Sequence, residues 1–173
     1  VTVRNTGATE TGALTIALSG TNAAAFSLSA EDLANIAAGG SRSFTVVPVL
    51  SLTAGTYSAT VTVSGGSVTS QSFTVSFTVD APTYTVEANK ASLAFGSKVE
   101  GYTPAPDAQT VTITNTGNSS VTLTLPTDTN YAITTTDSLT LAPSGTAVVS
   151  IQPKTGLAVG AYTATLTFAT DHS

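Results

Sequence analysis

The sequence predicts an all-β protein with two tandem β-sandwich domains, and three observations support this. Apolar and polar residues alternate along many short segments, which is the period of a β-strand and not of a helix. Turn-forming runs such as Asn-Thr-Gly and Pro-Ser-Gly separate these segments. The same order of segments occurs twice within 173 residues, so each copy is large enough to form a small sandwich core.

Three pairs of matching segments define the repeat. VTVRNTG corresponds to VTITNTG, LTAGTYSATV to LAVGAYTATL, and FTVVP to VSIQP (residues 1–7 and 111–117, 52–61 and 157–166, 44–48 and 149–153). The offset between the copies falls from 110 at the first pair to 105 at the second. The first copy therefore has about five additional residues in a surface loop, which we place in residues 23–38.

The first copy is predicted to be built of strands with one short helical exception. Residues 30–38 follow Ser29 and begin Ala-Glu-Asp-Leu, which predicts an N-cap and a single helical turn. Glu31 and Asp32 would then lie at a solvated helix start, where the helix dipole favours carboxylates. Residues 71–79 are predicted to close the first copy as a strand.

The second copy shows the strand period most clearly. Residues 84–88 and 92–95 are predicted to form an incoming pair of strands before a strand at 109–115. Two later segments alternate apolar residues with threonine, so each has one apolar and one hydroxylated face. The apolar positions are Val121, Leu123 and Leu125 in the first of these segments and Tyr162, Ala164, Leu166 and Phe168 in the second.

The domain boundaries are predicted at residues 1–80 and 83–173, joined by a short hinge that Pro82 stiffens. The first copy has no counterpart of residues 84–95, and the second has no counterpart of residues 71–79. We therefore expect the first sandwich to lack its first strand and the second to lack its last. Such sheets expose edges that could accept a strand from a neighbour.

The pattern Leu-x-x-Gly-x-Tyr-x-Ala occurs once in each copy and places Tyr57 and Tyr162 at a strand start after a tight turn. This is the arrangement of a tyrosine corner, in which the hydroxyl bonds to upstream backbone. The pattern therefore favours an immunoglobulin-like Greek-key topology for each sandwich. Because the chain contains no cysteine, the core must be stabilised by packing alone.

The composition argues against several classes of function. The chain has 5 Lys and Arg against 10 Asp and Glu, a net charge of -5, and a single histidine. Scattered cations cannot neutralise a run of phosphates, so we expect no nucleic-acid partner. The sequence predicts no cofactor, no metal site and no catalytic residues. It has no apolar run of 18 residues, so we expect no direct membrane insertion.

These motifs resemble bacterial immunoglobulin-like repeats of the choice-of-anchor D and Hydin-like kind. The resemblance covers nearly the whole chain, once per copy, and rests on Val-Thr-x-x-Asn-Thr-Gly and Leu-x-x-Gly-x-Tyr-x-Ala-Thr-Leu. The segment LAFGSKVEGYTPAP (residues 93–106) is similar to the start of modules in giant bacterial surface proteins. The resemblance implies an extracellular or cell-surface location and a neighbouring immunoglobulin-like repeat as partner. It implies no catalytic residue.

Several polar or aromatic residues remain as candidate sites. Tyr102 and Tyr131 are the aromatics we would test first for stacking on a ligand, although both could instead anchor loops or the core. Asp128, Asn130 and Asp137 are expected to form turns, because no calcium-loop spacing surrounds them. Asp171 and His172 are expected to form an unanchored chain end and not a catalytic dyad.

The function predicted from these observations is a non-enzymatic structural or adhesive repeat that acts as a stalk or spacer. Two alternatives stay open. The chain could be a module that binds a host glycan or protein through loops on a rigid scaffold. It could also be the subunit of a filament that assembles by β-strand donation.

Overall fold

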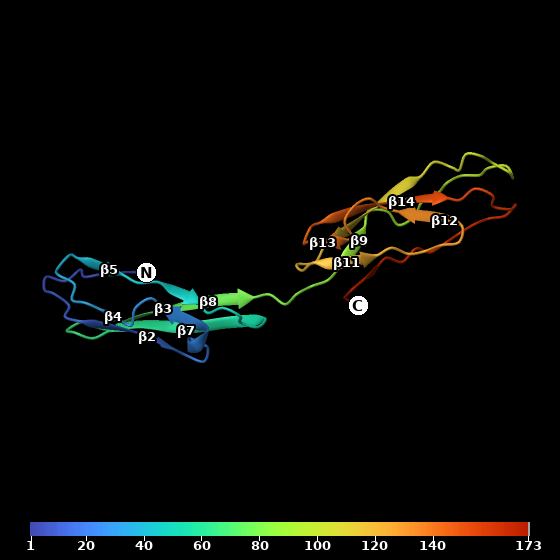
Figure 1. Ribbon diagram of the computed structural model, residues 1–173. Coiled ribbons are helices and arrows are strands. Elements are labelled where there is room, and N and C mark those ends of the chain that lie inside the picture. The colour runs from blue at the N-terminus through green and yellow to red at the C-terminus, as the bar shows by residue number, and fades with distance from the viewer. Residues whose placement is uncertain (173) are drawn as a thin grey trace. The chain divides into compact units, whose positions relative to one another are not determined.

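The computed structural model describes residues 1–172 and divides into two compact units, Val1–Ala81 and Pro82–Ser173 (Figure 1). Every strand pair that it describes is antiparallel. Helical structure within residues 1–172 amounts to one 3-10 turn, η1 (Ala23–Ala25). The predicted all-β fold is therefore confirmed.

The first unit is organised around a four-stranded sheet in the order β4-β2-β7-β8. Two short ladders complete the unit, β1 with β5 and β3 with β6. The strands of the sheet are β2 (Leu14–Ser19), β4 (Asp32–Leu33), β7 (Gly55–Ser64) and β8 (Gln71–Val79). Those of the ladders are β1 (Thr2–Arg4), β3 (Phe26–Leu28), β5 (Ser41–Ser43) and β6 (Val46–Pro48).

The core of the first unit lies between the sheet and the ladders. Alternate residues of β2 and β7 face inward, and Ile16 and Val61 are almost fully buried. Phe44, between β5 and β6, packs against them from the opposite side. Period-two alternation therefore places the apolar faces of β2 and β7 in the core, as the sequence predicted.

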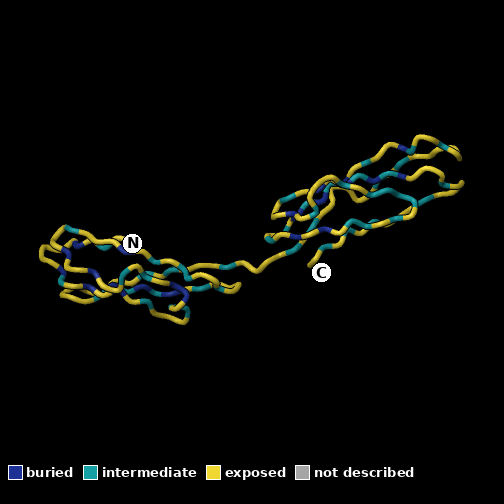
Figure 2. Tube along the Cα trace, in the orientation of Figure 1, coloured by how far each residue is buried: buried dark blue, intermediate teal, exposed yellow. Residues whose placement is uncertain are grey.

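The second unit has two sheets that face each other. Their orders are β12-β14-β10-β9 and β13-β11-β15. The first sheet contains β9 (Val86–Ala88), β10 (Gln109–Asn115), β12 (Tyr131–Thr134) and β14 (Thr146–Pro153). The second sheet contains β11 (Val121–Thr124), β13 (Thr140–Leu141) and β15 (Ala169–Thr170). Both sheets contribute residues to one core, including Ile113, Val149 and Leu123. Figure 2 shows the buried stretches of this unit in dark blue.

Two buried asparagines repeat in the two units, at the ends of β1 and β10. The Asn115 side chain is completely buried, and its Nδ2 donates to the carbonyls of Ser119 and Leu141, each at 2.9 Å. Its Oδ1 accepts the N–H of Gly117 at 2.9 Å. Because Leu141 belongs to β13, this side chain ties the end of β10 to the facing sheet.

The same arrangement occurs around Asn5 in the first unit. Its Nδ2 donates to the carbonyls of Thr9 at 2.7 Å and Ile36 at 2.9 Å, and its Oδ1 accepts the N–H of Gly7 at 2.9 Å. Asn5 is 8% exposed. The Asn-Thr-Gly segment is thus more than a turn signal, because its first residue satisfies three backbone groups in each unit.

The helical turn predicted in residues 30–38 is wrong. Residues 32–33 form β4, and the N–H of Ile16 donates to the carbonyl of Glu31 at 2.6 Å. The hydroxyl of Ser29 accepts the N–H of Thr45 and caps no helix. Glu31 and Asp32 are exposed beside or within this strand, not at a helix start. Pairing with β2 and burial of Leu33 override the local helix signal.

The additional residues of the first copy lie outside residues 26–38, which are most of the range predicted for them, residues 23–38. Phe26 pairs with Pro48, and Tyr131 occupies the same position opposite Pro153. The offset between the copies has therefore reached 105 at Phe26. The extra residues therefore precede Phe26, and of the predicted range only residues 23–25 can contain any of them.

Two predicted strands of the second unit are missing. Residues 92–95 belong to no strand, and the segment predicted at 162–168 is paired only beyond it, in β15. Its counterpart in the first unit, β7, lies between β2 and β8 and pairs with both. An alternating sequence fixes the face of a strand, but a ladder forms only where a neighbouring strand supplies hydrogen bonds.

Candidate functional site

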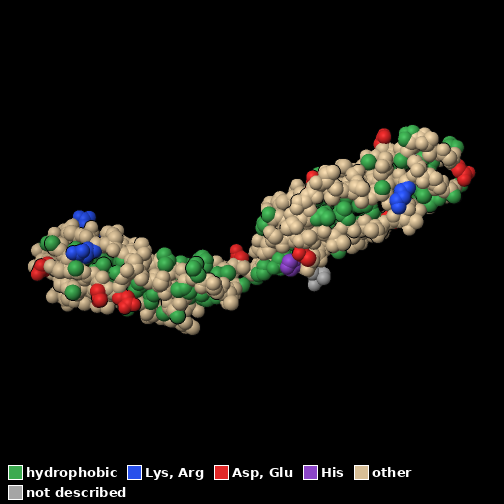
Figure 3. Space-filling view, viewed as in Figure 1, with side chains coloured by type: hydrophobic (Ala, Val, Ile, Leu, Met, Phe, Trp, Pro, Cys, Tyr) green, Lys and Arg blue, Asp and Glu red, His purple; other side chains and the backbone are tan. Residues whose placement is uncertain are grey.

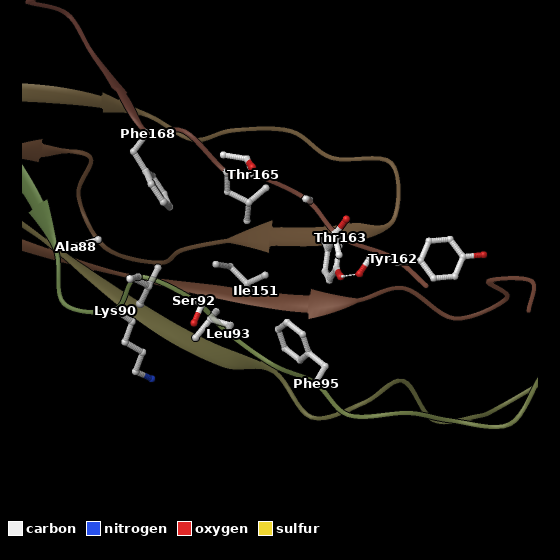
Figure 4. A pocket seen from close by; sticks show the side chains of 15 residues that line it. Ala88, Lys90, Ser92, Leu93, Phe95, Ile151, Tyr162, Thr163, Thr165 and Phe168 are labelled. Atoms are coloured by element: carbon white, nitrogen blue, oxygen red, sulfur yellow. Dashed lines mark hydrogen bonds between the residues drawn. The ribbon is translucent and has the colours of Figure 1, made fainter. Parts of the chain in front are cut away.

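The second unit contains an open cleft of about 370 Å³, which we call the aromatic cleft. Leu93 and Phe95 line one wall, and Phe168 faces them across the cleft (Figure 4). Ile151 of β14 lies between the walls. Tyr131 completes the lining at one end, with its ring centroid 5.9 Å from that of Phe95. The volume of the cleft lies within the range of ligand sites.

The aromatic cleft is open because residues 162–168 lack the close packing of their counterparts. In the first unit the equivalent side chains Ala59, Val61 and Val63 are buried by the neighbours of β7. In the second unit Ala164 is exposed, and Leu166 and Phe168 are half-buried. The same sequence pattern therefore forms core in one unit and cleft wall in the other.

An adjoining hollow of about 550 Å³ extends the aromatic surface. It shares Phe95, Tyr131 and Tyr162 with the aromatic cleft and adds Tyr102. Three of the four tyrosines singled out from the sequence thus lie along one continuous surface. Tyr57 lies in the first unit.

The hydroxyls of Tyr102 and Tyr131 are both engaged within the unit. Tyr131 donates to the carbonyl of Tyr162 at 2.8 Å, as the dashed line in Figure 4 marks. Tyr102 donates to the carbonyl of Lys154. The Lys154 ammonium in turn donates to the carbonyls of Asp128 and Thr129 at 3.0 and 2.9 Å. Both tyrosines therefore anchor backbone, while their side chains line the hollow. Ligand stacking by either ring stays a prediction.

Tyr57 and Tyr162 make the same local hydrogen bond in the two units. Tyr57 donates to the carbonyl of Thr53 at 2.8 Å, and Tyr162 donates to that of Ala158 at 2.9 Å. Each acceptor lies four residues upstream, which is the contact that a tyrosine corner makes.

Replacing these tyrosines with phenylalanine should lower stability by similar amounts. We expect Tyr57→Phe and Tyr162→Phe each to reduce the free energy of unfolding by about 1 kcal/mol, because one hydrogen bond is lost and the ring is kept. Urea denaturation measures this loss. Tyr84→Phe is the control, with an expected change below about 0.5 kcal/mol. A loss in only one of the two corner variants would show that the bonds are not equivalent.

The carboxylates of Asp128 and Asp137 accept hydrogen bonds from backbone N–H groups. The Oδ1 atom of Asp128 accepts the N–H groups of Asn130 at 2.8 Å and Tyr131 at 3.0 Å. Asp137 accepts the N–H of Val148 at 2.7 Å. No cluster of three or more His, Cys, Asp or Glu side chains with metal-binding geometry occurs among residues 1–172. The side chain of Asp128 therefore acts as a turn acceptor, whereas that of Asp137 accepts from β14, eleven residues further along the chain.

The expectation of an unanchored chain end is wrong. The His172 ring stacks on Tyr84 with centroids 3.8 Å apart and planes at 4°. The N–H of Thr122 donates to Oδ1 of Asp171 at 2.8 Å, and His172 Nδ1 lies 2.9 Å from the same oxygen. The backbone bond from Thr122 is the main reason that the pKa of Asp171 lies below its ordinary value, and His172 adds to it.

The docking of this segment should depend on pH. Because the pKa of Asp171 is lowered in the folded state, its stabilising contact is present above the ordinary aspartate pKa of about 3.9 and is lost as pH falls through the lowered value. We expect the amide resonance of Thr122 to shift in that acidic range in an NMR titration. Asp171→Asn, which does not ionise, should abolish the shift. A titration that is unchanged by Asp171→Asn would contradict this assignment.

The aromatic cleft offers apolar contact and little reactive chemistry. Its lining contains a single charged side chain, Lys90, whose ammonium donates to the carbonyl of Thr110 at 2.9 Å. Figure 4 shows Lys90 pointing away from the cleft. The remaining polar lining consists of hydroxyls such as Ser92 and Thr165. This arrangement suits a ligand with an apolar or aromatic face.

Sequence reasoning missed four important residues. Phe95 and Phe168 form facing walls of the aromatic cleft, and Asn5 and Asn115 carry the repeated buried network. The signal for the asparagines was present, because Asn-Thr-Gly occurs at the same place in both copies. The cleft had no such signal, since its walls come from segments about 70 residues apart.

No family model matches the chain, and no curated protein matches it. One solved structure to which it is similar is a protein of unknown function from Porphyromonas gingivalis W83. The two share 17% sequence identity over 87% of this chain and 71% of that one, with a TM-score of 0.32. Within residues 1–172, no helix has the length and apolar character needed to cross a membrane.

Proposed function

We propose that the chain is a non-enzymatic spacer built from two immunoglobulin-like repeats of a large secreted or surface protein of bacteria. The observation that carries this proposal is a set of structural contacts that both units share. The buried asparagine network and the tyrosine bond occur in both units, with equivalent partners. The two copies of the repeat therefore share the contacts that stabilise the framework of each unit.

The hollows of the two units, by contrast, differ in place and lining. The first unit has a hollow of about 550 Å³ along β1 and the start of β8, lined by residues such as Val3, Glu10 and Phe73. The aromatic cleft lies between other segments. A spacer requires a repeated scaffold and no repeated site, and its partners are the neighbouring repeats of the same parent chain.

Single-molecule pulling on the full chain, tethered at residues 1 and 173, tests the spacer function. We expect two separate unfolding events, each extending the chain by about 250–300 Å, because each unit has its own core. One event that unfolds the whole chain at once would contradict a modular spacer. Asn115→Ala should lower the force of one event and leave the other unchanged.

A second candidate function is binding of a glycan or protein in the aromatic cleft. The observation that favours it is the gathering of Phe95, Tyr102, Tyr131 and Tyr162 along one open surface. Arrays of glycans and host proteins probed with the full chain test this function. Phe95→Ala should weaken any specific binding, and Leu50→Ala, at a 93% exposed residue of the first unit, is the matched control. Arrays without a hit would contradict the candidate.

A further inference from the structure

The strand β8 forms one edge of the four-stranded sheet in the first unit. It pairs with β7 along all nine of its residues, from Gln71 to Val79. Within the described residues no strand pairs with its other side. A row of backbone N–H and C=O groups therefore faces outward over the length of a long strand.

This edge has none of the features that normally block pairing with another chain. Proteins protect edge strands with charged residues, proline or bulges. The strand β8 contains no charged residue and no proline, and no charged residue occurs between Arg42 and Asp80. On the face in view in Figure 3, most charged side chains of the first unit gather toward one end of that unit, and one acidic side chain lies at the other end. Like-charge repulsion would not oppose a second copy at β8.

The sequence of β8 is complementary to itself in one antiparallel register. When two copies pair around Val75, all nine residues of each strand find a partner. Phe73 then lies opposite Phe77 of the other copy, and Thr74 lies opposite Ser76. Aromatic pairs and hydroxyl pairs directly opposite each other stabilise antiparallel ladders. If the two copies paired around Ser76 instead of Val75, fewer residues of β8 would have a partner, and Asp80 would lie opposite Ser72.

The two faces of β8 fit this pairing. Phe73 and Val75 pack against the core, whereas Phe77 on the same face remains 41% exposed. The proposed register brings Phe77 against Phe73 of the second copy and covers it. On the outer face, β7 and β8 already form hydroxyl pairs, with Thr62 2.9 Å from Ser72. Serine and threonine across a second ladder would repeat this pattern.

We propose that two copies of this chain associate through β8, antiparallel and about a two-fold axis at Val75. The two four-stranded sheets then become one sheet of eight strands, and the interface is isologous. The association does not depend on the spacer function, because it uses the edge of a single unit. It is an encounter of modest affinity, since the contact is one strand wide.

Sedimentation equilibrium of the full chain tests the association. We expect a monomer–dimer equilibrium at concentrations up to about 1 mM. The double variant Thr74→Lys/Ser76→Lys places introduced lysines opposite each other in the proposed register. It should weaken dimerisation at low salt by at least about tenfold. Thr15→Lys/Ala17→Lys is the control. It adds the same charge to solvent-exposed positions of β2, which is not an edge strand of the sheet, and it should leave the dimer unchanged.

A charge swap tests the register. Thr74→Glu/Ser76→Glu should also fail to dimerise alone but should form a heterodimer when mixed with the double lysine variant. Circular dichroism and thermal melting establish that each variant is folded. Hydrogen exchange of the unsubstituted chain gives a second readout, in which protection of residues 71–79 should rise with protein concentration.

The proposal is overturned by any of three results. A chain that stays monomeric at about 1 mM contradicts it. A dimer that survives the lysine substitutions contradicts it as well. The third result is protection from hydrogen exchange that rises with protein concentration at residues 161–168 and not at residues 71–79. It would show that association uses this unpaired segment of the second unit.

Discussion

Asn115→Ala is expected to destabilise the second unit by about 3 kcal/mol. The substitution removes the amide that donates to the carbonyls of Ser119 and Leu141, and these groups lie around a completely buried side chain. Each buried carbonyl without a donor costs about 1–3 kcal/mol. For a unit of this size, the melting temperature should fall by roughly 10–20 °C, which differential scanning calorimetry measures.

Two further variants separate loss of donors from loss of volume. Asn115→Asp keeps the shape but faces a carboxylate toward two carbonyls, so we expect at least as large a loss near neutral pH. Asn89→Ala removes an exposed asparagine of the same unit that accepts one N–H, and should change stability by less than about 1 kcal/mol. If Asn115→Ala were as mild as Asn89→Ala, the buried network would not stabilise the unit.

Gly117→Ala is expected to destabilise the second unit by about 2–3 kcal/mol. A Cβ atom on Gly117 would overlap the carbonyl group of Thr83 and lie 3.1 Å from the backbone nitrogen of Thr85. Both neighbours are backbone atoms of the segment that leads into β9, and the N–H of Gly117 donates to the carbonyl of Thr85 at 3.3 Å. That segment must therefore move away, with the loss of its hydrogen bonds. Chemical denaturation measures the loss.

The repeat supplies the control for this variant. Gly7 occupies the same place in the first unit, where a Cβ atom would approach only Oδ1 of Asn5 at 3.2 Å and the carbonyl of Thr9 at 4.0 Å. Gly7→Ala should therefore cost less than about 1 kcal/mol. Equal effects of the two substitutions would show that the approach of Thr83 is not the cause.

The sequence predicted strands best where a partner strand runs along the predicted segment. Residues 71–79 and 109–115 form strands with the predicted bounds, because β8 pairs fully with β7 and β10 lies between β9 and β14. Residues 162–168 have the same period and form no strand of that extent. Periodicity shows which face of a segment is apolar. It does not show whether another strand lies beside the segment to form hydrogen bonds with it.

The candidate site was predictable only in part. Tyr102 and Tyr131 were singled out as isolated aromatics, and the fold brings them to one surface with Tyr162. Phe95 and Phe168 gave no signal, because they read as core residues of strands. The role of the Asn-Thr-Gly segments was also hidden, since a turn and a buried hydrogen-bond network use the same residue types.

By itself, the sequence determined that this chain is all-β, because alternation of side chains is a local property of the backbone. It also determined that the chain repeats one framework, since matching residues occur in the same order in both copies. Only the tertiary structure decided which alternating segments became core, cleft wall or free edge. Burial and pairing depend on strands that are distant in sequence. Segments that match between the two copies therefore pack against different neighbours in the two units.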